Sequence, residues 1–236
     1  MDCRVIGLLL AVFFFSTSCD NQNPPIPDVD FLSRDAHFSI ADETVVLPFV
    51  ALSGASVRDA NFQAAFDKAS SSDDARKQLV KQANDPERPV SARSLRMSIA
   101  LYGSYNEMSI SRKICPLLSR MWARQLCTGL RSEELADLPG SFELMDIREI
   151  SMLKSHTTVG RERVFDQIVS MQLTKAGLVQ TVCDRDPSSK FCSAAVVLDD
   201  HLLAHWTVWS GDETAEHMAN RQGIAIVRFI DRHLRY

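Results

Sequence analysis

The chain has 236 residues, of which 45% are hydrophobic and 24% are charged, and this composition is ordinary for a globular protein. Its net charge is −4 and no block of lysine and arginine stands out, so bulk charge gives no support for nucleic-acid binding. The length fits one domain or two small ones and is enough to bury a hydrophobic core.

The N-terminus begins with an apolar segment over residues 5–15, which follows a positive charge at Arg4. Spanning a membrane takes about 20 apolar residues, so this run is too short, but it has the length of a signal-peptide hydrophobic region. Three small residues then precede Cys19. This arrangement resembles the lipobox of bacterial lipoproteins. The resemblance implies a signal peptide over residues 1–18, cut just before a cysteine that carries lipid such as palmitate.

Two features bear on this interpretation. Lipoboxes usually have Leu three positions before the cysteine, where this chain has Ser16, and Ser16 with Ser18 also forms a small-x-small site for ordinary signal cleavage. A third interpretation is that residues 5–15 form a buried apolar helix, but the Pro- and Asn-rich sequence that follows disfavours it.

Cysteine parity favours lipidation. Of the six cysteines, Cys3 leaves with the signal, and lipid on Cys19 leaves an even number suited to an oxidising compartment.

The polar, Pro-rich residues 20–30 cannot bury enough apolar surface to fold. We therefore expect a flexible tether over residues 19–34 and a single globular domain over residues 35–236. The expected location is the cell membrane, with the lipid-anchored domain facing the periplasm. Asp20 after the lipid cysteine resembles the inner-membrane retention signal of enterobacterial lipoproteins, which slightly favours the inner over the outer membrane.

The N-terminal half of the domain shows β-type and then helical patterns. Residues 37–53 predict two strands around an Ala41-Asp42 turn, and Pro48 makes the second an edge or bulged strand. Residues 57–84 predict two helices, and the alternation over residues 95–101 predicts a half-buried strand.

The second half ends in the clearest structural signal. A single helix is predicted over residues 117–126, and no clean period marks residues 142–153. Three strands and then a long helix capped by Asp212 follow at the C-terminus. The remaining predicted elements are a short helix over 132–138, a helix over 159–175, strands over 178–183, 192–198 and 202–209, and a final helix to about residue 234. The sequence thus predicts an α+β fold, an antiparallel sheet with helices packed on one face, and a C-terminal hairpin followed by a long helix.

The four remaining cysteines pose a pairing problem. Cys183 and Cys192 flank a polar loop, and a disulfide there would staple a hairpin with a stabilisation of roughly 2.5–3 kcal/mol. One straight helix would hold Cys115 and Cys127 about 18 Å apart, whereas a disulfide needs Cα atoms within about 7 Å. Either that helix breaks, or these cysteines bridge elsewhere, or they stay reduced, and all three pairings remain open.

No contiguous catalytic motif is present: the sequence lacks a Gly-x-Ser-x-Gly elbow, Ser-x-x-Lys, a phosphate-binding loop and His-Glu-x-x-His. Residues 52–56 are interpreted as a small-residue turn rather than a nucleophile loop. His201 and His205 could share a strand face and bind a metal, but no third ligand has matching spacing. We therefore predict no catalytic residue, no metal and no cofactor, and a protein that is more consistent with a non-enzyme.

The C-terminal hairpin is the expected contact surface. His205 and Trp209 share one strand face and Trp206 lies on the other, so one tryptophan is displayed unless helices cover both faces. The predicted partner-binding residues are Trp206, Trp209, His205 and His201.

The anchor, the size and the absence of motifs resemble, in layout, the immunity lipoproteins of bacterial secretion systems, which occlude a toxic effector's active site. The resemblance implies a membrane-anchored periplasmic binding protein that neutralises a secreted effector. Alternatives are an accessory or assembly lipoprotein of an envelope complex, and an envelope hydrolase with a noncontiguous site, since catalytic residues can be distant in sequence. A protein partner is expected, and no nucleic acid.

Overall fold

The computed structural model describes residues 30–68, 73–99, 113–128, 132–150, 177–183, 191–209 and 213–235. The expected signal peptide, Cys19, most of the expected tether, the helix over 159–175 and the Asp212 cap all lie outside these residues. The folded part begins earlier than the expected boundary at residue 35. A 3-10 helix over Asp30–Ser33 buries Phe31 and Leu32 in the main core.

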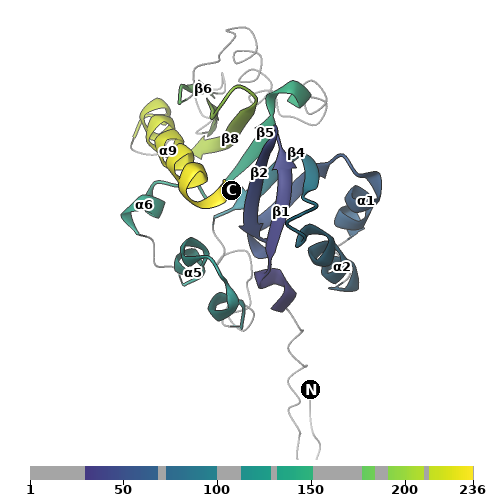
Figure 1. Ribbon diagram of the computed structural model, residues 1–236. Coiled ribbons are helices and arrows are strands. Elements are labelled where there is room, and N and C mark those ends of the chain that lie inside the picture. Colours follow the sequence, from purple (N-terminus) through teal and green to yellow (C-terminus); the bar gives the residue numbers. More distant parts are fainter. Residues whose placement is uncertain are drawn as a thin grey trace, which may run out of the picture.

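The described strands form one sheet in the order β2-β1-β4-β5-β8-β7-β6, with β3 paired to β4 (Figure 1). All pairings are antiparallel except the short parallel contact of β1 with β4 at Phe38–Val90 and Ser39–Ser91. The strands are β1 Asp35–Ile40, β2 Glu43–Pro48, β3 Leu52–Val57, β4 Val90–Ser98, β5 Ser141–Asp146, β6 Val179–Cys183, β7 Phe191–Val197 and β8 Leu202–Trp209. This mixed sheet confirms the α+β class.

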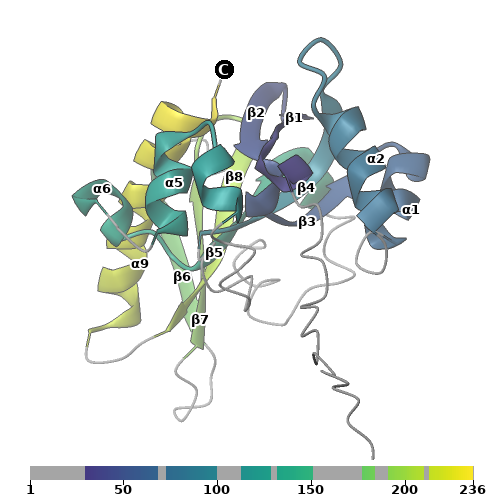
Figure 2. The ribbon, with the colours of Figure 1, turned by 90° about the horizontal axis from the view of Figure 1, so that it is seen from below.

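The helices flank this sheet in two groups. Figure 2 shows α9 beside β6, β7 and β8, with α6 and α5 on the same side of the molecule as α9, and α1 and α2 near β3 and β4. Their bounds are α1 Ala60–Lys68, α2 Asp73–Ala83, α5 Met121–Cys127, α6 Glu133–Ala136 and α9 Ala215–Phe229, which continues as a π-helix over Ile230–Leu234. Buried side chains from all of these helices belong to the larger of two core clusters. The expected hairpin followed by a long helix is therefore confirmed, and Thr214 caps that helix by accepting the His217 N–H at 3.3 Å.

The N-terminal hairpin follows the prediction. Ala41 and Asp42 have φ of 52° and 69°, so both turn residues adopt the left-handed conformation that a tight two-residue hairpin requires. β2 lies at the edge of the described sheet and ends at Pro48, which lacks a backbone N–H to donate.

Two strands correct the sequence interpretation. Residues 52–56, interpreted as a turn, belong to β3, which pairs with β4 despite register shifts on either side of Gly54–Ser56. Residues 142–146 belong to β5, which lies between β4 and β8 and is buried at every position after Ser141. A strand buried on both faces has no reason to alternate, so periodicity misses it.

The single helix predicted over residues 117–126 is wrong. A 3-10 helix over Cys115–Leu117 is followed by an extended Leu118, and α5 begins only at Met121. The break brings the Cα atoms of Cys115 and Cys127 to 5.6 Å, and the two cysteines form a disulfide. Of the three possibilities left open by the sequence, the helix break is the one the structure adopts.

The second disulfide confirms the expected staple. Cys183 on β6 and Cys192 on β7 are direct partners in the antiparallel register, with Cα atoms 4.0 Å apart. The bridge lies where β6 ends and beside Phe191, the first residue of β7.

Candidate functional site

The two tryptophans of β8 differ in exposure, one being buried and the other exposed. Trp206 is 1% exposed, and its Nε1 donates a hydrogen bond to Gln222 Oε1 on α9 at 2.8 Å. Trp209 is 53% exposed on the opposite face of the strand. The alternation predicted from the sequence is therefore present, but it places Trp206 in the core and removes it from the expected contact surface.

Trp209 is part of an exposed aromatic pair. Phe191 is its direct partner across β7 and β8, and the rings meet edge to face with centroids 4.4 Å apart and an interplanar angle of 85°. Phe191 is 50% exposed, so both rings present apolar surface to solvent. The sequence interpretation omitted Phe191. The signal was available, because a hairpin closed around residues 199–201 places residue 191 opposite residue 209.

A row of polar side chains crosses the same sheet face next to these aromatics. Arg96 on β4 is the register partner of Glu143 on β5, and Glu143 is the register partner of His205 on β8. Arg96 Nη2 pairs with Glu143 Oε2 at 3.4 Å, and Ser193 Oγ on β7 lies 2.7 Å from His205 Nε2. Ser193, His205 and Glu143 are buried, while Arg96 is exposed. The polar row thus runs from solvent at β4 into the sheet.

The Ser193–His205 contact has the separation of a nucleophile and its base, with a carboxylate one strand away. Ser193 lies within β7 with Val182 and Thr207 as partners on either side, so its backbone is engaged in the sheet. An oxyanion site needs free N–H donors beside the nucleophile, and β7 itself offers none at Ser193. Among the described residues, the arrangement is a hydrogen-bonded polar row within a sheet.

His201 lies apart from the other predicted contact residues. It is exposed in the turn before β8, where its N–H donates to Asp199 Oδ1 at 3.0 Å. Trp209 ends the same strand, about 26 Å away at about 3.3 Å per residue. The structure therefore places His205 on the same sheet face as the aromatic pair, about 13 Å along β8 from Trp209, and leaves His201 at the other end of the hairpin.

Within the described ranges, no group of three or more His, Cys, Asp and Glu residues is placed to bind a metal ion. No helix in that part of the chain is both long and apolar enough to span a bilayer. Comparison with known proteins found no matching family model, no matching curated protein and no matching solved structure.

Proposed function

We propose that this chain is a lipid-anchored binding protein of the bacterial envelope, whose contact surface is centred on Phe191 and Trp209. The observation that carries the proposal is the exposed edge-to-face pair formed by these two rings. Large rigid aromatics that remain exposed are typical anchors of protein interfaces. The proposed location in the envelope rests on the signal-like N-terminus and on Cys19.

The strands that carry the aromatic pair are fixed by their neighbours, so the pair is preorganised for binding. Phe191 directly precedes Cys192, which is joined by a disulfide to Cys183 on the neighbouring strand β6. β7 is paired on both sides, and β8 is paired to β7 and β5. A surface built on paired strands loses little conformational entropy when a partner docks, which favours tight stoichiometric association.

The surroundings of the pair support a protein partner. Thr207 is exposed beside the aromatics, and the exposed Arg96 with Glu143 supplies charged groups farther along the same sheet face, level with His205. An apolar centre with a polar rim is the usual composition of a protein–protein contact. Among such roles we favour an immunity protein or inhibitor that neutralises a secreted effector, because a preorganised surface suits stoichiometric blocking. An assembly lipoprotein of an envelope complex is the second candidate, and it would use the same surface.

The test begins with partner capture from envelope extracts, using the full-length tagged protein in mild detergent. The affinity for the captured partner is then measured for the native chain and for Trp209→Ala. Loss of an anchoring tryptophan should weaken binding about thirtyfold, which corresponds to about 2 kcal/mol. Leu117→Ala is the matched control, because Leu117 is also apolar and 47% exposed but lies on the 3-10 helix near α5.

Thermal melting accompanies each affinity measurement. Trp209→Ala loses only one aromatic contact, about 0.5–1.5 kcal/mol, so the melt should shift by a few degrees at most. Unchanged affinity of Trp209→Ala for the partner would overturn the proposed surface. Turnover of envelope substrates by the purified protein alone would overturn the binding role. Rescue of growth when the chain is co-expressed with a captured toxin separates the immunity role from the assembly role.

A further inference from the structure

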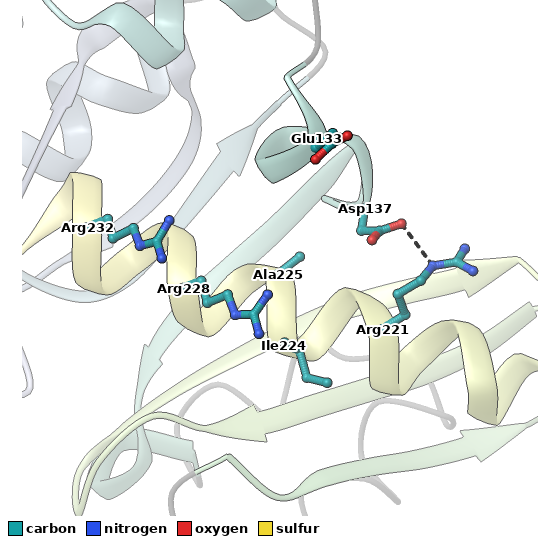
Figure 3. A pocket seen from close by; sticks show the side chains of 7 residues that line it. All are labelled: Glu133, Asp137, Arg221, Ile224, Ala225, Arg228 and Arg232. Atoms are coloured by element: carbon teal, nitrogen blue, oxygen red, sulfur yellow. Dashed lines mark ion pairs between the residues drawn. The ribbon is translucent and has the colours of Figure 1, made fainter.

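A second surface lies along α9, which packs on the face of the sheet opposite the aromatic pair. A hollow of about 440 Å³ separates α9 from α6. Figure 3 shows Arg228 and Arg232 along the face of α9 that is turned to the viewer, with Asp137 reaching from the end of α6 toward Arg221. We call this hollow the α9 groove. Its lining residues are Glu133, Asp137, Arg221, Ile224, Ala225, Arg228 and Arg232.

The groove continues beyond Arg232. A second hollow of about 440 Å³ is also lined by Arg232, together with His233 and residues around the start of α5. Arg232 lies in the π-helix that continues α9, and π-helical turns often occur at functional sites. The two hollows therefore meet at a basic residue.

The charges in the groove are not equally satisfied. Arg221 pairs with Asp137 at 2.9 Å and with Glu213 at 3.0 Å. The side chain of Arg228, by contrast, makes no hydrogen bond or ion pair with any described residue. It lies one turn before Arg232, and like charges at this spacing repel each other by a few tenths of a kcal/mol. An anionic group in the groove would relieve that repulsion and supply Arg228 with a partner.

Basic residues near a helix C-terminus also complement the helix dipole. That effect accounts for the sign of these charges, but it acts equally on arginines that point to open solvent. Residues four apart on a helix share a face, so the common direction of Arg228 and Arg232 follows from their spacing. The features that point to a ligand are the hollow that both arginines line and the lack of any partner for the Arg228 side chain among the described residues.

The other lining residues distinguish between two possible anionic ligands, a membrane surface and an acidic peptide segment. Ile224 is 52% exposed in the groove, and Ala225 is buried at its base. The lining mixes arginines with the carboxylates of Glu133 and Asp137, and this mixture does not match the uniformly anionic surface of a membrane. A peptide segment can instead place its carboxylates on the arginines and an apolar side chain on Ile224.

We propose that the α9 groove binds a carboxylate-rich, partly apolar segment of a protein partner, with Arg228 as its main ionic contact. The inference rests on the proposed role as a protein binder, but not on the aromatic pair as its surface. A charge-assisted contact between a guanidinium and a carboxylate is bidentate and directional, so it would also fix the orientation of the bound segment.

The test uses the full-length chain in mild detergent and a fluorescein-labelled peptide of alternating Glu and Leu, followed by fluorescence anisotropy. A matched Lys and Leu peptide is the probe of opposite charge. Arg228→Glu should weaken binding of the acidic peptide about tenfold, and Arg228→Lys should retain most of the affinity. Added salt should weaken binding by the native chain, because the contact is ionic and partly exposed.

Arg88→Glu is the matched control, because it makes the same change of charge at an exposed turn outside the groove. If Arg88→Glu and Arg228→Glu lose the same affinity for the acidic peptide, the effect depends on net charge alone and the inference is overturned. Binding to phosphatidylglycerol vesicles without binding to the acidic peptide would also overturn it. Acidic peptide binding that survives in Trp209→Ala, while partner capture fails, would contradict the proposed function and leave the groove inference standing.

Discussion

Gly223 on α9 lies against Val179 on β6 so closely that there is no room for a Cβ unless a neighbour shifts. A Cβ at position 223 would overlap Val179 Cγ2 and would come 3.4 Å from Trp206 Cη2. Glycine in a helix interior normally costs about 0.8–1.0 kcal/mol relative to alanine. The close approach of α9 to the sheet is therefore the reason for this residue.

The first prediction concerns this contact. Gly223→Ala should destabilise the protein by about 1–2 kcal/mol, because the clash with a stiff β-branched side chain exceeds the gain in helix propensity. Urea denaturation measures the change. Gly140→Ala is the control, since a Cβ there meets nothing within 4 Å. Val179→Ala in the same chain should recover part of the loss, and strict additivity of the two substitutions would contradict the proposed overlap.

The second prediction concerns the broken helix. Replacing Cys115 and Cys127 together by serine should lower the free energy of unfolding by about 2–3 kcal/mol in the chain-entropy account. The disulfide holds a 3-10 turn against α5 across the break at Leu118. Equilibrium denaturation of the double variant gives the magnitude. Nonreducing peptide mapping should recover the 115–127 and 183–192 pairs, and any crossed pair would contradict the structure.

The third prediction separates the two tryptophans of β8. Trp206→Ala should cost about 3–5 kcal/mol, because it empties a core site and leaves Gln222 without the indole donor. Trp209→Ala should cost no more than about 1.5 kcal/mol, since its ring is half exposed. Thermal and urea melts of the two variants, measured side by side, check this order. Comparable destabilisation by both would place Trp209 in the core as well.

The sequence predicted those elements whose local signals agree with their environment. The turn at Ala41-Asp42, the edge strand ending at Pro48 and the C-terminal hairpin with its helix all have one buried face and clear turn residues. The strand β5 was not predicted, because it is buried on both faces and contains Glu143, a residue type that is usually exposed. Glu143 is tolerated there because Arg96 pairs with it, and that pairing depends on two strands distant in sequence.

The candidate site was predictable only in part, because it also depends on contacts between elements that are distant in sequence. Strand alternation correctly placed His205 and Trp209 on one face. It could not decide whether Trp206 or Trp209 faces the core, because that depends on where α9 packs. The polar row needs the order of β4, β5, β8 and β7, which no local pattern encodes. The break before Met121 was likewise invisible, because the apolar spacing continues through it although Leu117 and Met121 are exposed.

The fourth prediction concerns pH. Asp146 is fully buried at the end of β5 and accepts hydrogen bonds from Arg148 Nε at 2.9 Å and Nη2 at 2.8 Å, and from Arg58 Nη2 at 3.2 Å. Burial by itself would raise the pKa of Asp146. The hydrogen bonds and charge of Arg148, with the bond from Arg58, outweigh burial and hold this pKa below its usual value.

A lowered folded-state pKa means that the unfolded chain binds the proton more tightly. Asp146 therefore contributes stability above about pH 4, and this contribution is lost as the pH falls through the folded-state pKa. Asp146→Asn should be less stable at neutral pH by about 1–3 kcal/mol and should show a flatter decline in acid. Urea melts from neutral to acidic pH test this. Asp231→Asn, at an exposed ion pair with Arg235, should change stability by less than about 1 kcal/mol.

The last prediction concerns the anchor. If Cys19 carries lipid, Cys19→Ala should release a periplasmic protein or leave an unprocessed precursor, because the thiol is the acylation site in lipoproteins with this arrangement. One acyl chain gives only marginal membrane binding, so stable anchoring requires the additional chains of a fully processed lipoprotein. Fractionation of cells expressing the native chain and Cys19→Ala, with immunoblotting, measures the distribution. Cys3→Ala is the matched control, because Cys3 lies within the expected signal peptide and should not alter anchoring. Cys19→Ala protein that is normally cleaved yet still sediments with membranes would contradict lipidation and favour ordinary signal cleavage at the Ser16–Ser18 site.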